Sequence, residues 1–262
     1  MKPGFWRVLI CTAVCIHSLT RAQEAPQTDT VLARVCDNLT ELNKTLPDFV
    51  VEEALRSSEL RKGRVFRETR FVSEMTCVKN SRPPAVTWGE SRHVLALNDK
   101  PAPRSAHIKG PVTLAGGFIS ALESTLSMNN RAYQEFSASG FEPVDGVSAI
   151  VLSFVTKEGQ TGMWLDFDGK PYASKDIGRI WIDPQTMQVV KFARKFGGNL
   201  PGHMEISFEE EFSRTVIDGK EYWLPKTVTA SDGSRGRVYS YVADYSKYRR
   251  FTVSSSLEYE KN

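Results

Sequence analysis

The amino-acid sequence predicts an α+β fold that is mainly antiparallel β: a curled up-and-down half-barrel of about eleven strands, with two amphipathic helices against its concave face. Apolar residues recur at helical spacing in two stretches, both in the first half of the chain. Elsewhere they alternate with polar residues, and turn sequences separate the alternating runs. A twisted sheet with so many strands must curl, so the helices can bury their apolar sides against its inner face.

The chain begins with the features of a secretory signal peptide. A short basic start precedes an apolar run from Val8 to Leu19, which is too short to span a bilayer, and Thr20-Arg21-Ala22 offers a small-x-small cleavage site. We therefore expect an exported protein with no stable membrane insertion after the signal is removed. The expected organisation is a signal peptide over 1–22, a disordered linker over 23–29 and a single domain over 30–262.

The charge of the chain changes once the signal peptide is removed. The formal net charge is +3, and Lys2, Arg7 and Arg21 contribute three positive charges. The remaining chain is therefore close to neutral, and its overall charge is no argument for nucleic-acid binding.

Two of the 4 cysteines, Cys11 and Cys15, leave with the signal peptide, so Cys36 and Cys77 remain. Two cysteines in an exported chain suggest a disulfide, and closing a loop of this length would stabilise the fold by about 4 kcal/mol. Two separate buried thiols, which behave as small hydrophobic groups, are the alternative.

Two stretches have the periodicity of amphipathic helices. The first starts near Asp29 or Thr30, either of which can cap it, and it ends before Pro47. The second runs from about Thr113 to Ser127 and ends at Met128-Asn129-Asn130. The apolar stripes of the two helices are Val31, Val35, Leu39, Leu42 and Leu46, and Phe118, Ile119, Leu122 and Leu126.

The remaining chain is expected to form strands joined by tight turns. The central pair flanks Asp183-Pro184-Gln185-Thr186, where proline suits the second position of a type I turn and the aspartate can bond the turn backbone. Residues Pro101 to Val112 are expected to form a long loop. Other expected strands include Gly162–Asp168, His203–Ser213, Arg237–Asp244 and Arg249–Tyr259.

Three phrases in the second half carry a resemblance to a known family: EPVDGVSAIVLSF, GRIWIDPQTMQVVKFAR and FEEEFSRTVIDGKEYWLPKTVTA. They resemble the strands and turns of the LolA/LolB-like lipoprotein-carrier proteins and of the related RseB-like sensor domain. The resemblance implies an open barrel preceded by an amphipathic helix, a periplasmic location, and an apolar cavity able to hold acyl chains. Secretion is the alternative location. No ligand-binding residue of that family matches a position here.

No catalytic or metal-binding motif is recognisable in the sequence. The histidines of the mature chain, His93, His107 and His203, are not spaced as metal ligands, and no nucleophile elbow of the G-x-S-x-G type is present. We therefore expect no catalytic residues, no metal and no cofactor. Alternation places Glu210 on the apolar face of its strand, where we expect it to lie near a rim or to meet an arginine.

The candidate lining of the cavity follows from strand alternation, which places apolar side chains on one face of two strands. Trp164 and Trp181 fall on the opposite face of their strands, so ordinary core packing is the alternative interpretation of these aromatic residues. The candidate lining residues are Met163, Leu165, Phe167, Ile206, Phe208 and Phe212.

Together these features favour an exported, non-enzymatic binding protein that holds a lipid, an acylated protein or another envelope component in an apolar concavity. The second helix and the loop from Pro101 to Val112 would act as the lid. One alternative is an envelope interaction or scaffold protein with a filled core. Another is a hydrolase whose site assembles from residues distant in the sequence.

Overall fold

The computed structural model describes residues 27–80, 87–108, 120–167, 169–203 and 205–252, and the expected signal peptide lies outside these ranges. No helix within them is both long and apolar enough to cross a membrane. The helices are α1 (Thr28–Thr45), α2 (Ser120–Leu126) and α3 (Met128–Arg131). The strands are β1 (Phe49–Arg61), β2 (Arg64–Asn80), β3 (Thr87–Leu97), β4 (Lys100–Pro101), β5 (Gln134–Val144), β6 (Val147–Thr156), β7 (Trp164–Phe167), β8 (Lys170–Ala173), β9 (Lys175–Ile182), β10 (Val189–Gly197), β11 (Glu205–Ile217), β12 (Lys220–Ser234) and β13 (Arg237–Arg250).

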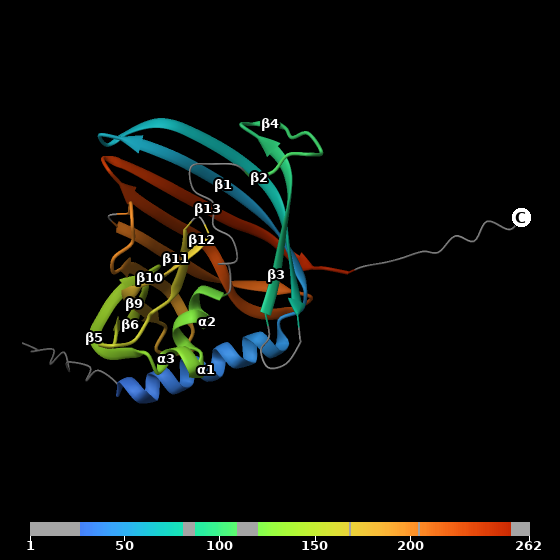
Figure 1. Ribbon diagram of the computed structural model, residues 1–262. Coiled ribbons are helices and arrows are strands. Elements are labelled where there is room, and N and C mark those ends of the chain that lie inside the picture. The colour runs from blue at the N-terminus through green and yellow to red at the C-terminus, as the bar shows by residue number, and fades with distance from the viewer. Residues whose placement is uncertain (1–26, 81–86, 109–119, 168, 204, 253–262) are drawn as a thin grey trace, which may run out of the picture.

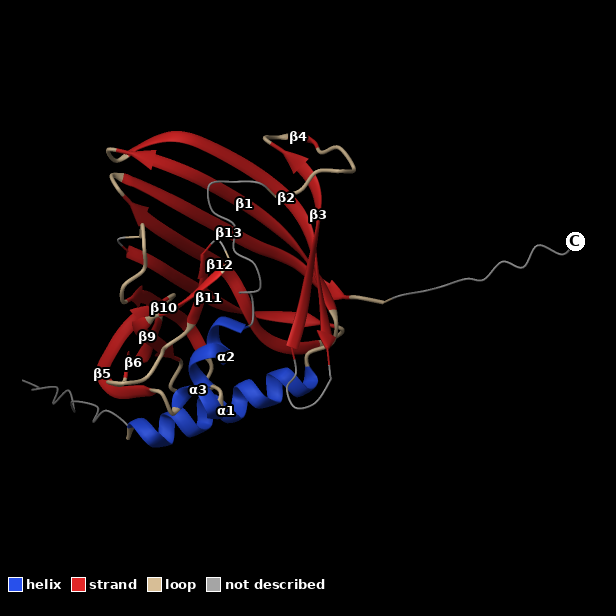
Figure 2. Ribbon diagram, viewed as in Figure 1, coloured by secondary structure: helices blue, strands red, loops and turns tan. Residues whose placement is uncertain are grey.

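Eleven of the strands form one curved, open, antiparallel sheet in the order β4-β3-β2-β1-β13-β12-β11-β10-β9-β6-β5. Neighbours in the sheet are mostly neighbours in the chain, but β1 pairs with β13 and so joins the two ends of the described fold. The sheet curls around α1 and α2, which lie on its concave side (Figures 1 and 2). The predicted fold class, a mainly antiparallel half-barrel with helices on its concave face, is confirmed.

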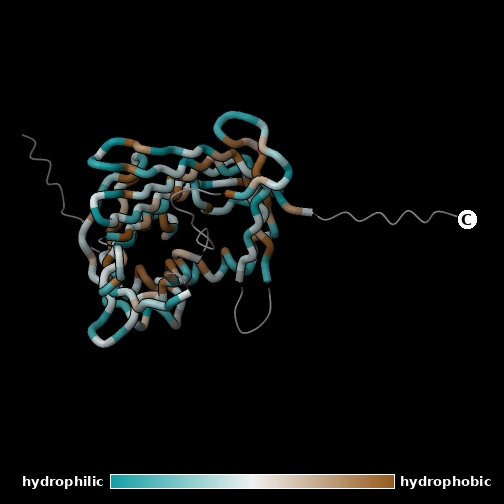
Figure 3. The backbone as a smooth tube through the Cα atoms, turned by 45° about the horizontal axis from the view of Figure 1, so that its top comes forward, coloured by the Kyte–Doolittle hydropathy of each residue, from teal (hydrophilic) through white to brown (hydrophobic). Residues whose placement is uncertain are grey.

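The hydrophobic core lies between the helices and this concave face. The buried stripe of α1 includes Val31, Val35 and Leu39, as its helical spacing predicts. Opposite the helices lies an aromatic layer in which the rings of Phe154 and Phe192 stack with centroids 5.9 Å apart. Hydrophilic residues gather instead in the loops that connect the strands (Figure 3).

A second, smaller apolar cluster lies on the convex face of the sheet. Trp181 packs there with Ala149, Val151 and Val190. Its indole Nε1 donates a hydrogen bond of 2.8 Å to Glu142 Oε2. Aromatic residues on both faces therefore have a structural explanation, because the buried indole has both an apolar surround and an acceptor for its N–H group.

Several predicted element boundaries need correction. Thr28 and Asp29 are helical and not part of a linker, because the backbone carbonyl of Gln27 accepts N–H groups from the first turn of α1. The described part of the second helix begins at Ser120, and residues 113–119 lie outside the described ranges. Met128–Arg131 continues the chain as the short helix α3.

Two predicted strands also differ. The run from Gly162 to Asp168 contributes β7, which pairs only with β8 in a separate two-stranded sheet. The predicted break between Asp244 and Arg249 is a bulge inside one strand. The pairing of β13 with β1 shifts between Ser246 and Arg249, and Lys247 has a positive φ of 57°, but the strand continues to Arg250. Residues 253–259 of the last predicted strand lie outside the described ranges.

Candidate ligand-binding site

Helix α2 separates two cavities on the concave side of the sheet. Leu122 and Leu126 face a small apolar pocket between α1 and the sheet, whereas Ser124 faces an open polar cleft. The helix has only seven residues, and an isolated helix of that length is not stable in water without tertiary contacts. The position of α2 therefore depends on the groups that hold it from both sides.

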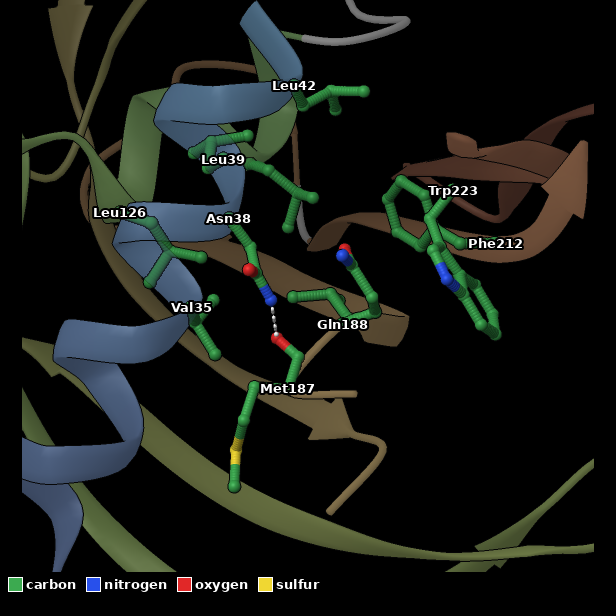
Figure 4. A pocket seen from close by; sticks show the side chains of 11 residues that line it. Val35, Asn38, Leu39, Leu42, Leu126, Met187, Gln188, Phe212 and Trp223 are labelled. Atoms are coloured by element: carbon green, nitrogen blue, oxygen red, sulfur yellow. Dashed lines mark hydrogen bonds between the residues drawn. The ribbon is translucent and has the colours of Figure 1, made fainter. Parts of the chain in front are cut away.

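The apolar pocket is almost filled. Its volume is about 20 Å³, which is close to the minimum that holds one water molecule. The side chains around it come from α1, α2, the central hairpin and β11–β12 (Figure 4). They are Val35, Asn38, Leu39, Leu42, Leu122, Leu126, Met187, Gln188, Val189, Phe212 and Trp223.

The central hairpin anchors α1 beside this pocket. Asp183 Oδ1 accepts the N–H of Gln185 at 2.9 Å and Oδ2 accepts the hydroxyl of Thr186 at 2.9 Å, as the turn sequence predicts. The turn presents its carbonyl groups to α1, where Asn38 Nδ2 donates to the carbonyl oxygen of Met187 at 2.8 Å (Figure 4). The hairpin therefore fixes the wall of the pocket that α1 provides.

The cleft on the other side of α2 is larger, with a volume of about 460 Å³. Two aromatic side chains stand at it, Trp164 with 66% and Tyr133 with 43% of its surface exposed. The cleft is lined by Ser124, Asn130, Tyr133, Gly159, Gln160, Thr161, Gly162, Met163 and Trp164. Mixed amide, hydroxyl and aromatic groups suit a polar or amphipathic ligand.

A buried arginine fastens α2 to the sheet. Arg194 lies on the concave face of β10, where its Nη1 donates to Ser124 Oγ at 3.0 Å and its Nη2 donates to Thr125 Oγ1. Its guanidinium carbon lies 5.5 Å from the ring centre of Phe192 and 5.4 Å from that of Phe196. These contacts place a cation inside an aromatic layer, where its polar partners are hydroxyl groups of α2.

The anion beside this arginine is poorly satisfied. Asp176 Oδ2 lies 3.7 Å from Arg194 Nε, and neither oxygen of the fully buried carboxylate forms a hydrogen bond with a described residue. Burial raises the pKa of Asp176, although the nearby charge of Arg194 opposes this change. Burial likewise lowers the pKa of Arg194. The pair is therefore close enough to attract but not bonded well enough to offset its desolvation.

Within the described part of the chain, Ser124 has no hydrogen-bond partner of the kind that activates a nucleophile. Its hydroxyl donates to the carbonyl oxygen of Ala121 at 2.7 Å and accepts from Arg194. A nucleophilic serine needs a base within hydrogen-bond reach. These contacts assign Ser124 to holding α2, and the described residues contain no group of three potential metal ligands.

A second buried polar cluster lies where β1, β2, β3 and β13 meet. Glu53 is fully buried and is bonded on every side. It accepts hydrogen bonds from Arg92 Nε at 3.0 Å, Ser73 Oγ at 2.7 Å, Tyr245 OH at 3.0 Å and Tyr241 OH at 3.3 Å. Burial alone would lower the pKa of Arg92, but the charge of Glu53 raises it.

Glu210 differs from both pairs because its carboxyl group has no hydrogen-bond partner among the described residues. Its carboxyl group is fully buried on the concave face of β11 and forms no hydrogen bond with a described residue. Burial raises its pKa well above the ordinary range of a glutamate. The expectation that Glu210 lies near a rim or meets an arginine is therefore wrong, although its predicted place on the apolar face is correct.

The six candidate lining residues do not meet in one cavity. Phe212 lines the apolar pocket and Met163 lines the cleft, on opposite sides of α2. Phe208 packs against Phe192 with ring centroids 6.3 Å apart. Ile206, earlier on β11, is half-buried. Their role in ligand binding stays a prediction.

Leu165 and Phe167 lie on β7, outside the main sheet, where the ring of Phe167 stacks on His203 at a centroid distance of 4.1 Å. Alternation places these two residues on one face of a strand, but it could not show that the strand lies outside the main sheet. Arg194 is not among the predicted site residues, and its signal in the sequence is its position between Phe192 and Phe196 in the alternation of β10.

The two remaining cysteines are free thiols in the structure, so the expected disulfide is absent from it. Cys36 Sγ lies on α1 and donates to the carbonyl oxygen of Leu126 at 3.1 Å. Cys77 is buried in the core on β2, where burial raises its thiol pKa. Each thiol thus has its own environment, which is the alternative that the sequence left open.

Comparison with protein-family models finds no match, and comparison with curated proteins finds none either. Among solved structures, the chain is similar to a DUF1329 family protein from Desulfovibrio piger, with 15% identity over 87% of this chain and 94% of that chain and a TM-score of 0.39. It is also similar to a putative outer membrane lipoprotein-sorting protein domain from Vibrio parahaemolyticus, with 11% identity, coverage of 85% and 93%, and a TM-score of 0.45. A LolA superfamily protein from Nitrosomonas europaea is similar with 14% identity, coverage of 86% and 94%, and a TM-score of 0.36. The last two are of the kind that the sequence resembles, and the likeness concerns the fold alone.

Proposed function

We propose that this chain is an exported, non-enzymatic protein of the cell envelope that binds the acyl chain of a lipid or of an acylated protein beneath α2. The observation that carries the proposal is the apolar pocket at α2, whose lining is contributed by both helices and the concave face of the sheet. An acyl chain needs an apolar surround of this kind, and α2, a helix of seven residues, is the wall that would move to admit it.

The ligand would enter by displacing α2. The pocket of about 20 Å³ is too small for an acyl chain, but the cleft of about 460 Å³ lies on the other side of the same helix. Burial of an acyl chain contributes about 0.8 kcal/mol for each methylene, so six methylenes contribute about 5 kcal/mol. That gain is of the same size as the loss of the two hydrogen bonds from Arg194 to α2, at about 1.5–3 kcal/mol each for bonds to a charged group. A longer acyl chain would also offset the loss of the bonds from Asn43 to Glu123 and from Cys36 to Leu126.

The test is lipid binding by the mature chain and by a variant whose pocket is blocked. Native mass spectrometry without detergent should find a co-purifying acyl compound, and a fluorescent fatty acid should bind and be displaced by unlabelled lipid. Leu122→Trp would fill the space under α2 and should weaken probe binding at least tenfold. Val155→Trp, on the exposed convex face, is the matched control and should leave binding unchanged.

Two findings together would contradict the proposal. The mass spectrum would contain no acyl compound, and the probe would bind equally to Leu122→Trp, Val155→Trp and the parent chain. The small volume of the pocket favours one second candidate, an interaction protein with a filled core. That candidate predicts a protein partner captured from the envelope and no acyl compound in the spectrum.

A further inference from the structure

A basic, exposed surface lies at the end of the sheet away from the helices (Figure 1). There the β1–β2 and β12–β13 hairpins end side by side, with Arg61 opposite Arg237 in the strand register (Figure 1). We call residues 56–70 and 231–240 the basic tip. Strand β1 runs for 13 residues from the end of α1 to this point, so the tip is about 40 Å from the helix at the usual rise of a strand.

The basic tip concentrates positive charge. It contains eight arginines and lysines but three acidic residues, a net charge of +5, whereas the whole chain has a net charge of +3. The rest of the chain therefore sums to −2. Glu59 accepts a hydrogen bond from Arg61 at 2.7 Å and also lies 3.8 Å from Arg237. Four of the eight basic residues of the tip form an ion pair with a described residue. The four that do not are Arg56, Lys62, Arg64 and Arg235.

Apolar side chains stand among these charges. Phe66 is 60% exposed, Val65 is 58% exposed, and Val238 on the neighbouring hairpin is 43% exposed. The register between β1 and β2 shifts at Leu60, which leaves Phe66 without a partner in the pairing. The Arg61 guanidinium carbon lies 3.5 Å from the centre of the Phe66 ring. Large apolar groups exposed at a protruding hairpin, rimmed by arginines, are typical of a contact surface.

We propose that the basic tip docks this protein onto the surface of an anionic lipid bilayer. The arginines and lysines would lie at the phosphate level, and Phe66 and Val65 would enter the boundary between headgroups and acyl chains. The valines favour a bilayer over a nucleic acid, because stacking on bases uses aromatic faces in a groove, and the tip is a protruding hairpin end. This inference goes beyond ligand binding and does not depend on the pocket at α2.

The experiment is flotation of the purified mature chain with vesicles of two compositions: phosphatidylcholine alone, and phosphatidylcholine mixed with phosphatidylglycerol. The chain should float with the anionic vesicles and remain behind with the neutral ones. Binding should weaken as salt is added, because the Debye length falls from about 8 Å at physiological ionic strength to about 3 Å in molar salt.

Two variants separate the contributions of charge and apolar contact. Lys62→Glu with Arg64→Glu should lower binding to anionic vesicles by roughly 25-fold or more, since each basic residue at such a surface contributes roughly fivefold. Phe66→Ser should lower it by roughly tenfold while leaving the salt dependence intact. None of the three residues is buried or bonded into the core, so the unfolding midpoints should stay close to that of the parent.

The matched controls lie elsewhere on the surface. Arg34→Glu with Lys170→Glu makes the same change in net charge at exposed positions of α1 and β8, and Val216→Ser removes another apolar side chain, 56% exposed, from β11. Both controls should float like the parent. Equal loss in the tip variant and the charge control would overturn the proposal, because binding would then follow net charge alone. Equal binding to neutral vesicles, or tight binding of soluble polyglutamate and of DNA that Phe66→Ser does not change, would overturn it as well.

Discussion

The concave face buries two arginine–carboxylate pairs that differ in how completely their polar atoms are bonded. In the first pair, Glu53 lies 3.0 Å from Arg92 and accepts three further hydrogen bonds from hydroxyl groups of β2 and β13. In the second, Asp176 lies 3.7 Å from Arg194 and accepts none from a described residue. Because desolvation is offset only by good geometry and full hydrogen bonding, the first pair is a structural tie and the second is a weak one.

The difference matters because of what each arginine holds. Arg92 and Glu53 connect strands that are also joined by long backbone pairings with single bulges, so this part of the sheet is held by both kinds of bond. Arg194 donates hydrogen bonds to Ser124 and Thr125, and these bonds hold the short helix α2 between two cavities. A loosely satisfied pair beneath α2 is therefore consistent with a wall that opens, whereas the saturated pair is consistent with a rigid frame.

The largest expected effect is on the saturated pair. Glu53→Gln removes the charge that Arg92 faces and disturbs three hydroxyl donors, and it should lower the free energy of unfolding by about 3–5 kcal/mol. Urea unfolding followed by circular dichroism measures it. A loss below about 1 kcal/mol would mean that this pair is no stronger than a surface ion pair.

The carboxyl group of Glu210, which forms no hydrogen bond with a described residue, should make the free energy of unfolding depend on pH. Its pKa is raised by burial above the unfolded value of 4.5, so the folded state retains a proton that the unfolded state releases. Its stability contribution is therefore present below that value and is lost as the pH rises toward the folded pKa. Relative to Glu210→Gln, the parent should lose up to about 1.4 kcal/mol per pH unit across this window.

Urea midpoints at about pH 4 and about pH 8 measure the Glu210 effect. The two proteins should be similar at the lower pH, and Glu210→Gln should be the more stable at the higher pH. Glu211→Gln, on the opposite face of β11 beside Lys191, is the neighbouring control. A parent that is as stable as Glu210→Gln at the higher pH would show that the carboxylate has found a partner.

The loosely bonded pair should respond less than the saturated one. Asp176→Asn removes a buried charge that forms no hydrogen bond, so the lost attraction to Arg194 and the avoided desolvation nearly cancel, with a net loss of about 1 kcal/mol or less. The same urea experiment checks this value. If Asp176→Asn destabilised the fold as much as Glu53→Gln, the two pairs would be equivalent and the contrast drawn from their geometry would fail.

The most local effect should be at α2. Ser124→Ala deletes the acceptor of Arg194 Nη1 and should cost about 1.5–3 kcal/mol, as for other hydrogen bonds to a charged group, with faster amide hydrogen exchange confined to α2. Ser148→Ala, at an exposed position of β6, is the control and should leave exchange in α2 unchanged. Exchange that rises evenly over the sheet in Ser124→Ala would show that α2 does not move separately from it.

The local structure could be predicted from the sequence because it depends on residues that are neighbours in the chain. The turn at Asp183 forms as its residues predict, and the stripe of α1 is buried as its spacing predicts. The residues that line one cavity could not be predicted, because alternation assigns a side chain to a face of its strand but does not show which strand pairs with it. Strand β7, for example, pairs outside the main sheet. Nor could the sequence show that Arg194 reaches Ser124, which lies 70 residues away.

The sequence by itself determined the class of fold, because periods of two and of 3.6 residues and turn residues act over a few positions. It also determined that Glu210 points to the apolar face. Tertiary structure alone decided the pairing of β1 with β13, the bonding of Glu53 against the isolation of Glu210, and the placement of α2 between two cavities. Those features depend on contacts between distant segments, whose geometry is set only when the whole sheet has curled around the helices.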